Sequence, residues 1–75
     1  MKTYKNLNGN SDVKAYQIYG DAIKIRFSDD AVYLYTDEKT GKEAIAKMKL
    51  LAVEGTGLST YIQENISKDS AEKLP

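Results

Sequence analysis

The stretch from Ile23 to Phe27 constrains the fold most strongly, because apolar and cationic residues alternate in it without exception. Side chains of an extended strand point alternately to the two faces of a sheet. Ile23, Ile25 and Phe27 therefore share one face, while Lys24 and Arg26 share the other. This pattern predicts a strand with one face against a core and one face toward water.

Two further strands are expected beside it. Residues 32–36 are all strand-favouring. Residues 11–18 alternate less cleanly, and we expect a β-bulge near Lys14-Ala15 that restores the pattern. Gly20-Asp21 occupies a two-residue hairpin position, where a positive φ at the glycine is expected.

The turn at Ser28-Asp29-Asp30 decides which way Tyr33 and Tyr35 point. A three-residue loop, with Asp30 in the left-handed conformation, would place both tyrosines on the core face with Phe27. A two-residue loop would place them outside, beside the two cations of the preceding strand. The sequence leaves both registers open, and a shift of one residue between them exchanges the two faces of the strand.

Two helices are expected after the strands. Apolar residues from 42 to 54 recur at helical spacing, and Gly55 is a favourable residue for ending a helix. Leu58, Ile62 and Ile66 recur every four residues and predict a second, shorter helix, with Thr56 or Ser59 as its N-cap.

The expected fold class is α+β, a three-stranded antiparallel β-meander with two C-terminal helices packed on one face. Residues 11–66 would form the single domain. Residues 1–10 are expected to be a flexible arm or a short strand, and residues 67–75 a polar tail that frays or lacks order. A polar loop is expected between residues 37 and 41.

Several short motifs resemble the KTSC domain, a short domain named after a C-terminal extension of some lysyl-tRNA synthetases that also occurs as stand-alone bacterial proteins. They are a strand containing Val13 and Ile18, the Ile-x-Ile-x-Phe strand, Tyr33-x-Tyr35, and Gly55-x-x-Leu58-Ser59-x-x-Ile62. The resemblance covers roughly residues 11–66. It implies structural roles for Tyr33, Tyr35, Gly55, Leu58 and Ile62, and it favours tyrosines that face inward.

The same resemblance implies little about activity, although RNA binding has been suggested for the family from its synthetase context. The chain also departs from the family pattern. Asp37-Glu38-Lys39-Thr40 replaces the usual Val-Pro after the tyrosines, and Val53 replaces a usual serine.

The composition excludes several kinds of site. The sequence has neither cysteine nor histidine, so the usual zinc and transition-metal sites and disulfides are excluded, and we expect no cofactor. No apolar run is long enough for a signal peptide or a membrane span, and we expect a soluble cytoplasmic protein without a membrane partner. Eleven basic residues balance eleven acidic ones, which argues against DNA binding and disfavours RNA.

The candidate interaction surface is the outer face of the sheet. With inward tyrosines, this face would carry Lys24, Arg26, Val32 and Leu34, and it would be more apolar than a solvated sheet should be. Either the N-terminal arm, through Tyr4 and Leu7, or a protein partner, including a second copy of the chain, could cover it. We therefore expect a small non-enzymatic interaction module that acts through protein contacts.

The alternative is an RNA-binding accessory domain, with tyrosines stacked on bases beside Lys24 and Arg26. Catalysis is not expected. The paired acids at 29–30 and 37–38 fall in predicted turns, and Gly55-Thr56-Gly57 lacks the lysine of a phosphate-binding loop.

Overall fold

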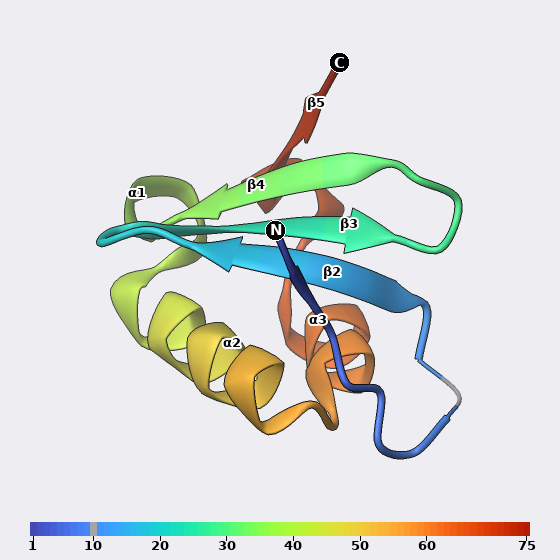
Figure 1. The fold of residues 1–75 in the computed structure, drawn as a ribbon. Coiled ribbons are helices and arrows are strands. Elements are labelled where there is room, and N and C mark those ends of the chain that lie inside the picture. Colours follow the sequence, from blue (N-terminus) through green and yellow to red (C-terminus); the bar gives the residue numbers. More distant parts are fainter. Residues whose placement is uncertain (10) are drawn as a thin grey trace.

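The computed structural model describes residues 1–9 and 11–75, so position 10 of the expected arm lies outside the described residues. Figure 1 shows an antiparallel sheet with helices on one face. Its five strands follow one another in sequence order: β1 (Lys2–Thr3), β2 (Val13–Ile18), β3 (Ala22–Phe27), β4 (Val32–Thr36) and β5 (Ala71–Leu74). The helices are α1 (Asp37–Thr40), α2 (Lys42–Glu54) and α3 (Leu58–Asn65), with a 3₁₀ turn, η1 (Lys68–Ser70), before β5.

The expected α+β class and the antiparallel meander are therefore present, but three strands and two helices are too few. The segment 71–74 is not a frayed tail, since it pairs with β4 from Val32↔Leu74 to Tyr35↔Ala71. The expected polar loop forms the helical turn α1, whose first turn is capped when Thr36 Oγ1 accepts a hydrogen bond from the Lys39 N–H at 3.3 Å. Within the arm, residues 2–3 form the short edge strand β1.

The turn between β3 and β4 has the three-residue form. The Phe27 N–H donates to the Ala31 carbonyl at 2.9 Å, and Asp30 is left-handed with φ of 68°. Ile25 therefore lies opposite Tyr33 and Ile23 opposite Tyr35, so both tyrosines face the helices. Of the two registers that the sequence left open, the structure has the one set by the three-residue loop.

The β2–β3 hairpin also has the expected register. Ile18 lies opposite Ile23, and the register shifts between Val13 and Ala15, which confirms the bulge. The turn itself differs, because Gly20 does not have the positive φ that the expected hairpin turns require.

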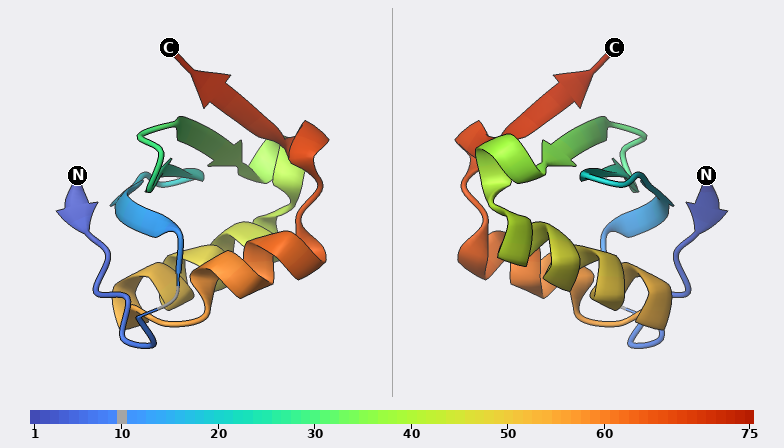
Figure 2. Two further views of the ribbon diagram at one scale, coloured as in Figure 1. Left: turned by 90° about the vertical axis from the view of Figure 1, so that its right-hand side faces the viewer. Right: turned by 90° about the vertical axis from the view of Figure 1, so that its left-hand side faces the viewer.

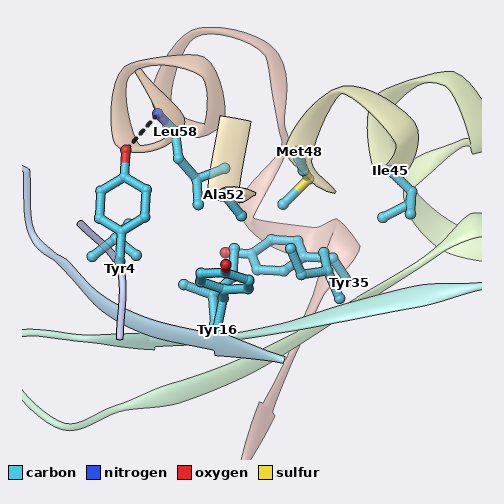
Figure 3. Packing of buried hydrophobic residues seen from close by; sticks show 10 residues of the cluster. Tyr4, Tyr16, Tyr35, Ile45, Met48, Ala52 and Leu58 are labelled. Carbon is cyan, nitrogen blue, oxygen red and sulfur yellow. Dashed lines mark hydrogen bonds between the residues drawn. The ribbon is translucent and has the colours of Figure 1, made fainter. Parts of the chain in front are cut away.

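Helices α2 and α3 cover the inner face of the sheet, as the two side views in Figure 2 show. The core between these layers is aliphatic at its centre and aromatic at its margin. Its largest fully buried side chains are Ile23, Ile25, Ile45, Met48 and Leu58. The rings of Tyr16 and Tyr35 lie between sheet and helices (Figure 3).

The N-terminal arm is fixed to the corner between α2 and α3. Tyr4 is buried, and its hydroxyl accepts a hydrogen bond from the Leu58 N–H at 3.3 Å (Figure 3). Neither Thr56 nor Ser59 caps α3, since its N-cap is Gly57 without a side-chain hydrogen bond. The Leu7 N–H donates to the carbonyl of Gly55, the left-handed residue that ends α2. Tyr4 therefore belongs to the helix side and does not cover the outer face.

Candidate functional site: the outer sheet face and an inner cavity

The four residues expected on the outer face do lie together. Lys24 is directly opposite Leu34, and Arg26 is directly opposite Val32, so they form two adjacent rows across β3 and β4. Arg26 is exposed and the other three are half-buried. Long cationic side chains commonly lie along neighbouring apolar surface in this way while their charge stays in water.

Strand β5 enlarges this face in a way that the sequence reading missed. Its residues Glu72 and Leu74 lie beside Leu34 and Val32, respectively. The first row thus reads Lys24, Leu34, Glu72 across three strands, with an apolar residue between opposite charges. We call the six residues Lys24, Arg26, Val32, Leu34, Glu72 and Leu74 the outer patch. No helix among the described residues covers the outer patch (Figure 2).

Two cations on or beside the outer patch make contacts within the chain. Lys14 forms an exposed ion pair with Asp30 at 3.0 Å, and this hydrogen bond holds the pKa of the Asp30 carboxyl below its usual value. The Lys24 ammonium lies over the ring of Tyr19, 5.5 Å from the centroid, within range of a cation–π contact.

The basic and aromatic surface required for base stacking is not assembled. Tyr33 and Tyr35 face the helices, on the opposite side of the sheet from Lys24 and Arg26. Of the six tyrosines, only Tyr19 is seen to contact a cation of the outer patch among the described residues.

The five residues of the resembled motif lie in the helix-facing half of the molecule. Leu58 is fully buried, Tyr35 is 4% exposed, and Tyr33 and Ile62 pack against the core. Gly55 has φ of 82° and closes α2.

A cavity of about 530 Å³ opens on this inner side, between α3 and the ends of β4 and β5. Its apolar walls come from Phe27, Ile62, Ile66 and Ala71, and its polar lining comes from Asp12, Ser28, Asp29, Tyr33, Tyr35 and Ser67. The sequence reading did not predict this cavity, because its lining comes from positions between 12 and 71 that only the fold brings together.

Tyr35 is the most perturbed titratable group at the cavity. Burial raises the pKa of its hydroxyl to about 12, and Tyr33 and the negative charge of Asp12 act in the same direction. Asp12 is held in place by the Ser59 hydroxyl, which donates to Oδ1, and by the Ser28 N–H, which donates to its carbonyl.

Comparison with known proteins gives no family model, no curated protein and no solved structure that matches this chain. The resemblance to the KTSC domain therefore stays a prediction. Within residues 1–9 and 11–75, no helix has the length and apolar character needed to cross a membrane. The same residues contain no group of three or more acidic, histidine or cysteine side chains placed to hold a metal ion.

Proposed function

We propose that the protein is a non-enzymatic interaction module that associates with a second copy of itself through the outer patch. The observation that carries this proposal is the row Lys24, Leu34, Glu72, in which an apolar residue lies between a cation and an anion on adjacent strands. Such a row is complementary to itself when it is turned over.

Consider a two-fold axis that lies just above the outer face and runs parallel to β4. This axis would stack the outer faces of two sheets on each other and place β4 over the β4 of the second copy. It would also place β3 of each copy over β5 of the other, so that Lys24 meets the partner copy's glutamate while Leu34 meets its own equivalent. Within one chain the backbones at Lys24 and Glu72 are two strand spacings apart, roughly 10 Å, and no ion pair joins the two side chains among the described residues.

The apolar part of the outer patch supplies the driving force for association. Val32, Leu34 and Leu74 are half-buried in the single chain. Each square ångström of apolar surface that a second sheet removes from water contributes about 25 cal/mol, before the entropy lost on association is subtracted. The opposite charges on either side set the register of the two copies.

The first test is the substitution Leu34→Lys, followed by sedimentation equilibrium across a range of concentrations. Two lysines would meet at the axis, and we expect self-association to weaken by at least about tenfold, or 1.4 kcal/mol. Leu50→Lys is the matched control, because Leu50 is 52% exposed on α2 and belongs to the other side of the molecule. A wild-type chain that stays monomeric at every concentration would refute the proposal.

A charge exchange tests the register. Lys24→Glu alone should weaken association, and adding Glu72→Lys should restore it, since the two positions would again carry opposite charges. RNA titration of the labelled protein is the competing measurement. Salt-sensitive shifts at Lys24 and Arg26 that are lost in Arg26→Glu, without self-association, would favour the RNA-binding alternative.

A further inference from the structure

The inner cavity combines aromatic walls with a fixed negative charge. The rings of Phe27 and Tyr33 meet edge to face, with centroids 5.7 Å apart and planes at 76°, so they form a corner. Tyr35 lines the same cavity. Two isoleucines of α3, Ile62 and Ile66, give it an apolar side.

The charge at this cavity is one-sided. Asp12 and Asp29 line it, and no lysine or arginine belongs to its lining among the side chains that the structure describes, which do not include that of Lys68. Asp29 is engaged by the adjacent turn, where its Oδ1 accepts from the Ala31 N–H at 3.0 Å. One carboxylate oxygen of Asp12 accepts a hydrogen bond from Ser59, and the second oxygen remains for a ligand. The negative charge of Asp12 also contributes to the raised pKa of the Tyr35 hydroxyl.

An aromatic corner beside a carboxylate is complementary to one class of ligand. The faces of aromatic rings attract cations, and alkylated ammonium groups suit them best because their charge is weakly hydrated and their methyl groups contact the rings. An anion would face Asp12 without a compensating cation among the described lining residues. A neutral apolar ligand would make no use of the carboxylate oxygen of Asp12 that Ser59 leaves free.

We propose that this cavity binds an alkylated organic ammonium group, with the cation between Asp12 and the aromatic corner and its apolar body against α3. The cavity volume of about 530 Å³ falls within the range of small-molecule sites, roughly 300–1,000 Å³. The site lies on the helix side of the sheet and is independent of the association through the outer patch. The ammonium group belongs either to a small free molecule or to a methylated lysine side chain of a partner.

The test uses choline and its neutral isostere 3,3-dimethylbutan-1-ol, titrated into isotopically labelled protein and followed by amide and methyl NMR. Choline should shift resonances of Tyr33, Ile62 and Ile66, and the alcohol should bind at least about tenfold more weakly, which isolates the charge. A peptide with one trimethyllysine, compared with its unmodified form, distinguishes a partner side chain from a free amine.

Two variants separate binding from folding. Asp12→Asn keeps an oxygen that can accept from Ser59, so the fold is retained, and choline affinity should fall by about tenfold or more. Glu64→Gln, at an exposed position of α3, is the matched control and should leave the affinity unchanged. Equal binding of choline and the alcohol, equal binding to wild type and Asp12→Asn, or absence of shifts at the cavity would each overturn the proposal.

Discussion

At the scale of single residues, the corner between α2 and α3 depends on a glycine in close contact with the N-terminal arm. A Cβ built at Gly55 would lie 2.6 Å from the Lys5 Cβ, and the residue has φ of 82°. The arm cannot easily withdraw, because Tyr4 on one side and Leu7 on the other are hydrogen-bonded to this corner. Gly55 therefore meets a conformational and a steric requirement at once.

This pair of requirements can be separated by comparing two substitutions. Gly9 also has a left-handed φ, 76°, but no atom lies within 4 Å of its hypothetical Cβ. We expect Gly9→Ala to lower the free energy of unfolding by about 1 kcal/mol and Gly55→Ala by about 2 kcal/mol or more. Urea denaturation measures both values.

Removing the neighbouring side chain provides the control. In a Lys5→Gly background, Gly55→Ala should cost only about as much as Gly9→Ala does in the wild type, because the steric conflict is then gone. An equal loss in the free energy of unfolding for Gly9→Ala and Gly55→Ala would contradict the steric requirement, because it would mean that the arm at Lys5 can move away without loss of stability.

At the scale of elements, β5 shows where sequence patterns stop being informative. Ala71 pairs with inward Tyr35, and Leu74 pairs with outward Val32, so the two apolar residues of this strand lie on opposite faces. No alternation exists to be recognised. The strand forms because β4 offers an unpaired edge and because α1 and η1 guide the chain back, the Thr40 hydroxyl donating to the Ser70 carbonyl at 3.4 Å.

By contrast, elements with strong periodicity were predictable to within a residue or two. The alternation of β3 and the apolar spacing of α2 each reflect burial of one face. Burial of one face of a strand or helix produces a regular spacing of apolar residues, which can be read from the sequence. The hydrogen bond from the Leu58 N–H to the Tyr4 hydroxyl produces no such spacing, because it joins residues 54 positions apart, and it could not be predicted from the sequence. The same limit applies to the outer patch, whose acidic side comes from the unrecognised β5.

Deleting residues 71–75 tests the contribution of β5. Loss of the ladder to β4 should lower the free energy of unfolding by about 1–3 kcal/mol, given roughly 0.5–1.5 kcal/mol for each net hydrogen bond. The β4 amides that pair with β5 should then exchange faster with solvent. A chain that lacks only Pro75 is the control, and unchanged stability after the longer deletion would indicate a tail that contributes nothing.

At the scale of the whole molecule, the buried phenol of Tyr35 makes folding stability depend on alkaline pH. Its pKa is raised to about 12 in the folded chain from 10.0, so the folded state favours the neutral phenol. The stability linked to this group is complete below pH 10 and decreases as the pH rises toward 12. The molecule is therefore expected to unfold more readily in that window.

The variant Tyr35→Phe removes the ionisation and keeps the ring. Below about pH 9 the difference in free energy of unfolding between wild type and variant should stay constant, whereas between pH 10 and 12 the wild type should lose stability more steeply. Urea denaturation at a series of pH values checks this. If the free energies of unfolding of the two proteins changed in parallel over the whole pH range, the alkaline loss of stability could not be assigned to Tyr35.

The three-residue turn that ends in left-handed Asp30 has a consequence for how such a chain can change over evolution. Removal of one codon there would shift β4 by one position and exchange its faces, so that Val32 and Leu34 would enter the core and both tyrosines would leave it. The core, the aromatic cavity and the outer patch would be lost in one step. We therefore expect a change in the length of this loop to be tolerated less well than a change in the identity of its residues.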